Sequence, residues 1–410
     1  MSPVRRGLVS DLFEGVVAKR LTLVETVTER SNQHEFQGTE PLRALFGDAN
    51  RKGISTRFIR FTTDGDTVSE DGFISWSNVR EGKPRAAEYH CYYNGNAVTN
   101  AMQVGETLFL ALRRDGTALA IITPPDSTTQ SQLVWLFGLT DAAVSGIEFR
   151  DIAHEQPKEL SLAARYVLDE LGIVIEEEGA DLDGLTEKFG VEFPTTRVFS
   201  ELARSSLGRE VEARDNPDTV LMAWLEREEL LFRRLERRVV AERLKGGFIS
   251  AGGEANVEDF IAFSLSVQNR RKARAGQSLE LHLEALFSAH GIRFARGGET
   301  ENKNKPDFLF PGAAEYRDET FPVARLTMLG AKSTLKDRWR QVLSEARRIE
   351  HKHLVTLEPS ISEAQTNQMQ AEKLQLVVPK RIQETFRVGQ RTWLMTVSDF
   401  VGLVRERQAL

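Results

Sequence analysis

Short apolar runs separated by turn residues dominate the first 150 residues of the chain. Four of these runs are rich in β-branched or aromatic residues and end at Gly, Asn, Asp or Pro: "RFIRFTTD" (57–64), "AEYHCYYNG" (87–95), "ETLFLALRRDG" (106–116) and "TALAIITPP" (117–125). Asp115-Gly116, between the last two runs, predicts a β-hairpin. Because "EPLRALFGDA" (40–49) has helical character, residues 1–150 are expected to form a mostly-β domain with helical interruptions.

A helical and acidic stretch follows. Residues 158–173, "KELSLAARYVLDELGI", have apolar positions at helical spacing, and "IEEEGADLDG" (175–184) carries five acidic residues and no basic one. Such a charge run is usually solvated, so residues 151–195 are interpreted as an acidic helical linker.

From residue 196 the pattern changes to long helices followed by short strands. Residues 218–247 form a strongly amphipathic segment that ends at a Gly pair, and residues 257–292 predict two more helices. Four short apolar runs of strand type come next: "PDFLFP", "RLTMLGAKS", "KHLVTLEP" and "LQLVVP". Residues 196–410 are therefore expected to form a domain in which helices surround a small mixed sheet.

Composition excludes several classes of protein. The single cysteine, Cys91, excludes an internal disulfide and any cysteine-based zinc site, which favours a reducing cytoplasm. No apolar run reaches the length of a membrane span, and the N-terminus does not have the pattern of a signal peptide. The net charge of −6 argues weakly against a protein that coats nucleic acid, but it allows one that grips DNA in a single cleft.

Three residues near the predicted strands suggest a chemistry. Asp307 precedes one short strand, Lys332 ends the next, and Glu345 lies 13 residues beyond Lys332 on the following helix. Two carboxylates supply the hard oxygen ligands that Mg²⁺ prefers, and a divalent cation there would polarise a phosphoryl oxygen and activate water. A lysine can orient that water or offset charge on the phosphate. Each residue alone is more often structural, but the ordered set indicates metal-dependent phosphodiester hydrolysis.

The surrounding text resembles a known family. "NRRKARAGQSLELHLEALF", "KPDFLFPGAAEY", "FPVARLTMLGAKSTLKDRWRQVLSEA" and "LQLVVP" are similar to the catalytic domain of EcoRII-type restriction endonucleases, over roughly residues 200–385. The resemblance implies the PD-(D/E)XK nuclease fold, a mixed central sheet flanked by helices. The common motif has an acidic residue two positions before the lysine, where this chain has Gly330. The subgroup that cuts CCGG- and CCNGG-type sites moves that carboxylate to the following helix, and Glu345 matches the moved position.

The same resemblance assigns further site residues. Glu280 matches an acidic residue near the metal, so that the implied metal ligands are Asp307, Glu345 and Glu280. Tyr316 matches an active-site tyrosine, with ordinary packing as the alternative. Trp224 lies where the family fills the gap left by a flipped base, although it shares a helical face with Leu221 and Leu225 and fits a core position equally well.

A short charged motif after the strand is the implied reader of the DNA sequence. Lys336, Asp337 and Arg338 match the residues that contact the C·G pairs; an aspartate accepts from cytosine N4, and an arginine makes a bidentate pair with guanine. The alternative is that Thr334 caps the helix and Asp337 completes a capping box. Leu335 begins an apolar stripe at helical spacing that continues through Trp339, Val342, Ala346 and Ile349, and Arg338 and Glu345 lie off this stripe.

Basic residues close to the predicted cleft are expected to contact the DNA backbone. "QNRRKARAG" (268–276) contains Arg270, Arg271, Lys272 and Arg274, which suit phosphate contacts; a solvated helix end is the alternative. Residues 1–150 resemble the EcoRII effector domain more weakly, which implies a DNA-binding pseudobarrel that holds a second copy of the recognition site. Arg85, Arg113 and Arg114 are candidate contacts there, with plain surface as the alternative.

The function that these features predict is a Mg²⁺-dependent type II restriction endonuclease. It would act as a homodimer on double-stranded DNA at a palindromic site flanked by C·C/G·G pairs, and a cognate DNA methyltransferase would act on the same site. A DNA-binding regulator on a dead nuclease scaffold is one alternative, although the triad is complete. A repair nuclease of the same fold is another, although it is expected to lack the "KDR" motif.

Overall fold

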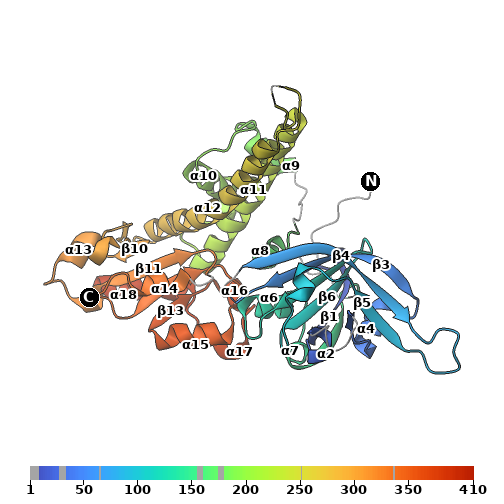
Figure 1. Cartoon of the computed structure of the whole chain (residues 1–410). Helices are drawn as coiled ribbons and strands as arrows, with labels where there is room; N and C mark the ends of the chain where they lie inside the picture. Colours follow the sequence, from blue (N-terminus) through green and yellow to red (C-terminus); the bar gives the residue numbers. More distant parts are fainter. Residues whose placement is uncertain are drawn as a thin grey trace. The chain divides into compact units, whose positions relative to one another are not determined.

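The computed structural model describes residues 9–26, 34–63, 66–154, 160–173, 180–250, 252–335 and 338–410, and it divides the chain into two compact units. The first unit comprises Met1–Glu176 with Ser360–Gln365, and the second comprises Glu177–Pro359 with Thr366–Leu410. Figure 1 labels the elements of both. None of the described helices combines the length and the apolar composition that a bilayer crossing requires.

The first unit is built on an eight-stranded sheet with the order β2-β5-β4-β3-β7-β6-β1-β8. Neighbouring strands pair antiparallel except β3 and β7, which are parallel. The strands are β1 (Phe13–Arg20), β2 (Glu35–Phe36), β3 (Arg51–Phe61), β4 (Thr67–Asn78), β5 (Tyr89–Tyr93), β6 (Thr107–Arg113), β7 (Ala118–Thr123) and β8 (Ile147–Asp151). The four predicted strands are confirmed as β3, β5, β6 and β7, and the predicted hairpin joins β6 to β7 through Gly116 at φ +83.

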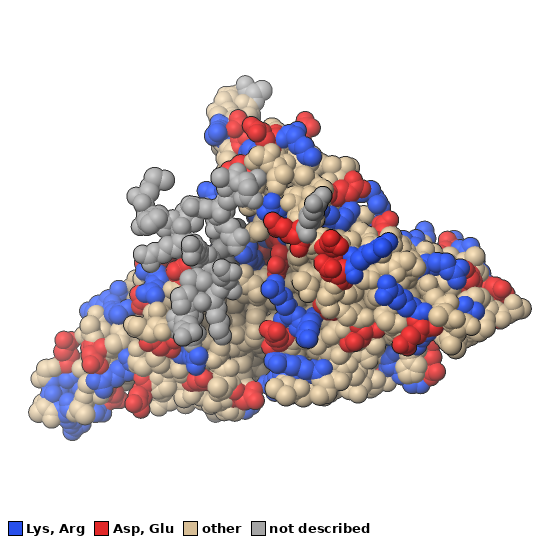
Figure 2. Space-filling view, turned by 180° about the vertical axis from the view of Figure 1, so that it is seen from behind, with Lys and Arg blue, Asp and Glu red and all other residues tan. Residues whose placement is uncertain are grey.

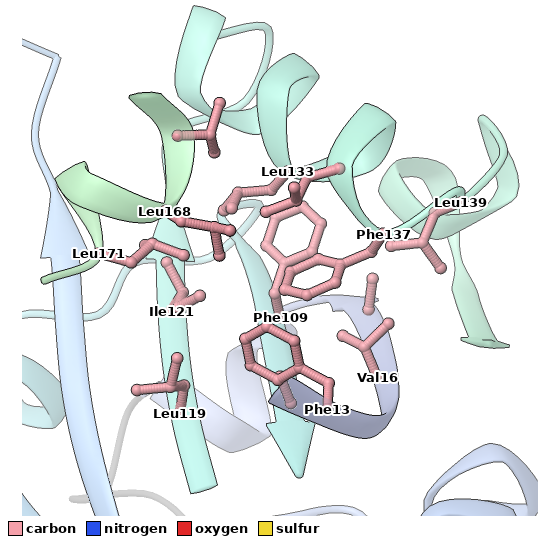
Figure 3. Packing of buried hydrophobic residues seen from close by; sticks show 14 of the residues in the cluster. Phe13, Val16, Phe109, Leu119, Ile121, Leu133, Phe137, Leu139, Leu168 and Leu171 are labelled. Atoms are coloured by element: carbon pink, nitrogen blue, oxygen red, sulfur yellow. The ribbon is translucent and has the colours of Figure 1, made fainter. Parts of the chain in front are cut away.

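Both faces of this sheet are buried at β6 and β7, which explains the unbroken apolar runs of these two strands. Phe109 and Ile121 point to one face, where they meet Leu133 and Phe137 at α6 (Thr128–Leu136) and Leu168 of α8 (Leu162–Glu170), as Figure 3 shows. Alternate residues of the same strands point to the other face and pack in a second core. That core includes residues of α4 (Glu40–Phe46) and α5 (Ala97–Asn100). The remaining helices are α1 (Val9–Leu12), α2 (Leu23–Thr26) and α7 (Ala142–Ser145).

The second unit contains a five-stranded mixed sheet flanked by helices, which confirms the predicted fold class. The sheet order is β13-β12-β11-β10-β9, where β9, β10 and β11 pair antiparallel and β11, β12 and β13 pair parallel. The strands are β9 (Ala295–Arg296), β10 (Phe308–Phe310), β11 (Thr327–Lys332), β12 (Lys352–Thr356) and β13 (Leu374–Val377), so all four short apolar runs are strands. His351 directly precedes β12, and His353 within the strand is buried.

The helices of this unit are α9 (Ala180–Glu187), α10 (Thr196–Ser206), α11 (Pro217–Gly246), α12 (Val257–Ala289), α13 (Ala313–Arg317), α14 (Trp339–Leu343), α15 (Glu363–Ala371), α16 (Lys380–Gln383), α17 (Val388–Arg391) and α18 (Val397–Ala409). The expectation of two helices within 257–292 is wrong, because α12 is one continuous helix of 33 residues. Its C-terminal half is anchored at Phe287, whose ring meets those of Phe308, Phe310 and Phe400 at centroid distances of 5.3–6.1 Å.

The predicted linker contributes to both cores. Leu160, Val167 and Leu168 are buried in the first unit. Leu182 of α9 packs with Phe199 and Phe232 in the second. Asp183, from the acidic run, forms a bidentate ion pair with Arg234 of α11 at 2.5 and 2.6 Å. Residues 175–179 of the acidic run lie outside the described residues.

Candidate active site

Asp307 and Lys332 are brought together by the antiparallel pairing of β10 with β11. Phe308 lies opposite Leu329, so the residue before β10 comes beside the last residues of β11. The Asp307 Oδ2 atom accepts a hydrogen bond from the backbone N–H of Ala331 at 2.7 Å and another from Lys332 Nζ at 2.9 Å. The Asp307 side chain is 17% exposed and that of Lys332 is 27% exposed, so the pair is partly desolvated and still open to a ligand.

Glu345 follows α14 and belongs to the same cluster. Burial and the nearby charge of Asp307 raise the pKa of its carboxyl to about 7, against the opposing effects of Lys332 and Lys352. Its Oε2 atom is buried and has no hydrogen-bond partner among the described residues. A buried carboxylate oxygen without a partner is costly, and such atoms concentrate where a ligand binds.

Gly330 explains why this carboxylate comes from outside the strand. A Cβ atom on Gly330 would lie 3.1 Å from Val342 Cγ2 and 3.3 Å from Leu354 Cδ1. Residue 330 is therefore covered by α14 and β12, and a larger side chain there would push the helix away. The same helix that occludes position 330 carries the chain on to Glu345.

The segment from Leu335 to Ile349 is only partly helical. The five residues of the predicted apolar stripe, Leu335, Trp339, Val342, Ala346 and Ile349, are all buried. The α-helix itself spans only Trp339–Leu343, its N-cap residue is Arg338, and Ala346 has φ +47. The capping box between Thr334 and Asp337 stays a prediction, because Asp337 lies outside the described residues. The backbone N–H of Leu335 is instead held by the carboxylate of Glu358.

Of the predicted base-contacting residues, Lys336 and Asp337 lie outside the described residues. Arg338 is exposed, and its backbone N–H donates to Leu335 O at 2.8 Å. The Arg338 side chain therefore lies at the surface, on a backbone held by this hydrogen bond.

Lys352 is a site neighbour that sequence reasoning missed. It is the first residue of β12 and is 8% exposed, and its Nζ atom donates to Ile349 O at 2.8 Å. Burial lowers the pKa of Lys352, while the charges of Glu301 and Glu345 oppose that effect. No sequence motif distinguishes this lysine, because in the sequence it is simply the polar residue at the start of an apolar strand.

The hydroxyl of Tyr316 is hydrogen-bonded to a carboxylate outside the predicted triad. It donates to Glu301 at 2.7–2.8 Å, and burial together with this hydrogen bond raises the pKa of Tyr316 to about 12. The backbone N–H of Arg348 donates to the same hydroxyl at 3.3 Å. These contacts fit the packing alternative, because the tyrosine ties the segment after Glu345 to α13.

Glu280 is already paired. Arg296 donates to its Oε2 atom at 2.6 Å and to Glu284 at 2.8 Å, which links α12 to β9. Within the described part of the chain, no cluster of three or more His, Cys, Asp or Glu side chains is placed to hold a metal ion. A role for Glu280 as a third ligand stays a prediction that requires the Arg296 pair to open.

The four basic residues of α12 divide into two kinds. Arg274 is 8% exposed, and its guanidinium contacts Glu228 and Glu229; Arg271 donates to both carboxylate oxygens of Glu236 at 2.8 Å. Both guanidinium groups form ion pairs with carboxylates of α11. These pairs do not fit the predicted contacts of Arg271 and Arg274 with the DNA backbone. Arg270 and Lys272 are exposed. Figure 2 shows Lys and Arg interspersed with Asp and Glu over the face in view, without a wide basic patch.

Trp224 lies in the core of the helical layer. Its ring is 3% exposed, packs 5.8 Å from His282, and has the Arg204 guanidinium over its face. Leu221 and Leu225 on the same helical face are also buried, as the core alternative predicts. Stacking on a flipped base requires an exposed ring, so the buried Trp224 does not fit the predicted role in base flipping.

The described cluster fits a divalent cation of the Mg²⁺ type. Mg²⁺ is usually held by one or two carboxylates, with waters and substrate phosphate oxygens as the other ligands. Asp307 and the unpartnered Glu345 Oε2 supply that number of hard oxygen donors, beside a lysine that compensates their charge.

Comparison with known proteins finds relatives that match part of this chain. Residues 232–401 match the family described as EcoRII C terminal. The chain is 41% identical over 219 residues to the type II restriction enzyme EcoRII of Escherichia coli, covering 53% of this chain and 52% of that enzyme. It is 31% identical over 154 residues to the type II restriction enzyme SsoII of Shigella sonnei, covering 35% of this chain and 49% of that enzyme. The chain thus matches about half the length of each relative.

Two solved structures are similar in part. The complex of metal-depleted Ecl18kI with uncleaved DNA is 21% identical, with a TM-score of 0.42 over 57% of this chain and 86% of that one. The complex of PspGI with substrate DNA is 15% identical, with a TM-score of 0.44 over 55% and 95%. The family match and the identity to EcoRII confirm the resemblance predicted from the sequence: residues 232–401 of this chain are similar to the family described as EcoRII C terminal.

Proposed function

We propose that this protein is a Mg²⁺-dependent type II restriction endonuclease that hydrolyses double-stranded DNA at a palindromic site flanked by C·C/G·G pairs. The observation that carries the proposal is the cluster of Asp307, Lys332 and Glu345, in which one carboxylate is fixed by a lysine and the other keeps a buried oxygen without a partner. A purely structural cluster would pair both carboxylates. The named relatives are restriction enzymes, which supports the same conclusion.

Each residue has a defined task in that reaction. Asp307 is oriented by the Ala331 N–H and Lys332, so its second oxygen is available to a cation. Glu345, whose pKa is raised to about 7, would be the second carboxylate ligand of the cation once its carboxyl is deprotonated. When bound, Mg²⁺ would polarise the phosphoryl oxygen and activate the attacking water. Lys332 stabilises the negative charge that develops on the phosphate, and hydrolysis with inversion leaves 5′-phosphate ends.

Sequence recognition is proposed for the turn that leads into α14. Arg338 has the geometry for a bidentate contact with guanine, and Asp337 has the acceptor for cytosine N4, with Lys336 beside them. The hydrogen bonds at Leu335 and Arg338 support this assignment for Arg338, because a base-reading side chain needs a backbone of fixed position. Arg270 and Lys272 remain the exposed candidates for phosphate contact.

The finer parts of the proposal concern assembly and regulation. The enzyme acts as a homodimer, because a palindromic site presents each strand to one active centre. The first unit binds a second copy of the site, and a cognate methyltransferase protects the same sequence in the cytoplasm. The support for DNA binding by the first unit is its eight-stranded sheet, with the candidate contacts Arg113 and Arg114 at the end of β6.

The test uses purified full-length protein on unmethylated phage DNA with Mg²⁺, beside Lys332→Ala and the matched variant Lys373→Ala. Lys373 is an exposed lysine paired with Glu350, outside the cluster. Discrete fragments are expected from the wild type and Lys373→Ala but not from Lys332→Ala, and sequencing of their ends gives the site. Intact DNA with every divalent cation, even with an added second-site oligonucleotide, would favour the DNA-binding regulator instead.

A further inference from the structure

The paired helices α11 and α12 extend well beyond the core that holds them. Figure 1 shows the two helices side by side, ending in a turn remote from the five-stranded sheet of the same unit. From residue 237 to residue 273, not one of the described residues is buried. We call residues 237–273 the helical arm. A helix in water owes most of its stability to the burial of an apolar face, so an arm of this length without buried residues lacks a partner.

The arm exposes large apolar side chains in one neighbourhood. On α12 these are Val257, Phe260, Ile261 and Leu265, which are 48–55% exposed. At the end of α11 and in the following turn, Leu244 and Ile249 are 54% and 67% exposed. Scattered apolar residues are ordinary on a surface, but a grouped set on a projecting element marks an interaction site.

The exposed face of α12 has a heptad pattern. Glu258, Ile261, Leu265, Gln268 and Lys272 follow at spacings of 3, 4, 3 and 4 residues, and all five are exposed. Alternating spacings of 3 and 4 place residues on one stripe that suits a second helix. Phe248, Phe263 and Arg243 occupy the inner side, where the Arg243 guanidinium stacks 4.1 Å from the Phe248 ring. The stripe is therefore the outer side, turned away from α11.

Charge at the two ends of the stripe identifies the partner. Glu258 and Lys272 each lie seven residues from Leu265, on opposite sides of it. Suppose that two copies of α12 pack antiparallel across a two-fold axis near Leu265. Glu258 of each copy then lies opposite Lys272 of the other copy, so the interface contains two such ion pairs. Across the described residues, neither side chain has an ion-pair partner within the chain, unlike Asp259, which contacts Arg243, and Arg271, which contacts Glu236. The stripe is self-complementary, as a two-fold symmetric interface requires.

We propose that the outer stripe of the helical arm is the surface through which two copies of this chain dimerise, with Ile261 and Leu265 at the centre and reciprocal Glu258–Lys272 ion pairs at the ends. This inference deepens the homodimer of the proposed function and rests on it for the choice of a second copy as the occupant. It reassigns Lys272 from the DNA backbone to the partner copy and leaves Arg270 as the exposed cation for phosphate.

The first test measures the mass of the full-length chain by size-exclusion chromatography with light scattering, without DNA. The wild type is expected at twice 46.1 kDa, and Leu265→Glu at 46.1 kDa at the same concentration. A charge at the centre of the stripe should raise the dimer dissociation constant at least about 30-fold. Ser266→Glu is the matched control, because Ser266 is exposed about 100° around the helix from Leu265 and should leave the dimer intact.

The second test uses charge exchange and does not depend on a disrupted variant. Glu258→Lys alone and Lys272→Glu alone should each weaken the homodimer about fivefold, because each places two like-charged pairs at the ends. The double variant should recover the wild-type constant. A mixture of the two single variants should form heterodimers in preference to homodimers, because both ends are then complementary.

These outcomes separate the interface from the nuclease. A wild type that has the mass of one copy at micromolar concentration, a dimer that survives Leu265→Glu, or single variants that mix without preference would each overturn the assigned surface. DNA cleavage is scored separately with Lys332→Ala, which leaves the arm unchanged and should remain dimeric. A dimer that fails to cut DNA would therefore overturn the nuclease and leave the interface standing.

Discussion

Replacing Glu345 by glutamine should make the protein more stable at alkaline pH while abolishing the proposed activity. The wild-type carboxyl is half-buried, its Oε2 atom lacks a partner among the described residues, and burial together with Asp307 raises its pKa to about 7. Glutamine has nearly the same shape and carries no charge to desolvate. The prediction therefore has the sign opposite to that of most substitutions in a protein interior.

The magnitude follows from linkage between folding and protonation. The pKa of Glu345 rises from the ordinary value of 4.5 to about 7. This shift corresponds to about 3 kcal/mol in the free energy of unfolding, since each pKa unit corresponds to about 1.36 kcal/mol. Because Glu345 is only half-buried, solvent screens part of this electrostatic effect, and we expect the charged carboxylate to destabilise the fold by about 2 kcal/mol. Because the folded-state pKa lies above the unfolded one, the folded protein binds more protons between pH 4.5 and 7. Wild-type stability relative to Glu345→Gln is thus lost as the pH rises through that interval.

The assay is urea denaturation of both full-length proteins in EDTA, at pH 5 and at pH 8.5, followed by tryptophan fluorescence. The two proteins should differ little at pH 5, and the variant should be about 2 kcal/mol more stable at pH 8.5. Other titrating groups are common to both proteins and cancel in the difference. Glu350→Gln is the control: a hydrogen bond and the charge of Lys373 lower the pKa of exposed Glu350, so that its removal should not stabilise the protein at high pH. A variant less stable than the wild type at pH 8.5, or a difference independent of pH, would refute the reasoning.

Three further predictions concern recognition and architecture. Arg338→Lys removes a bidentate donor and should cost about 1–3 kcal/mol of discrimination at the outer base pairs, measured by cleavage of oligonucleotides with single substitutions. Asp218→Ala should destabilise the second unit by about 3 kcal/mol or more in urea denaturation, because this buried carboxylate accepts from the N–H groups of Lys380, Val397 and Ser398 at 2.9–3.0 Å; an unchanged midpoint would contradict that role. Gly330→Glu restores the acidic residue of the common motif but should lower the melting temperature and fail to rescue activity in a Glu345→Ala background, because α14 fills the space; recovery of cleavage would show that the helix yields.

Much of the site was predictable because its signals are local. Short apolar runs closed by turn residues located the strands of both units, and Asp307 and Lys332 could be placed at strand ends by counting along β10 and β11. The buried stripe from Leu335 to Ile349 was likewise visible in its spacing, although its helix is shorter than the spacing suggests. The periodicity of apolar residues indicates which side of a segment is buried, and this indication holds even where the helix ends earlier than the spacing suggests.

The tertiary structure alone decided which partners the charged side chains take. Arg271 and Arg274 read as a basic cluster along the chain, but they meet carboxylates contributed by α11, about 35–46 residues away. Tyr316 meets Glu301 rather than the Asp307–Lys332 pair, and Lys352 enters the neighbourhood of Glu345 without any motif. The raised pKa of Glu345 depends on burial and on a carboxylate 38 residues earlier. Local sequence fixes spacing and amphipathic character, but desolvation and pairing of charges depend on which elements pack together, and packing is settled only when the whole domain has folded.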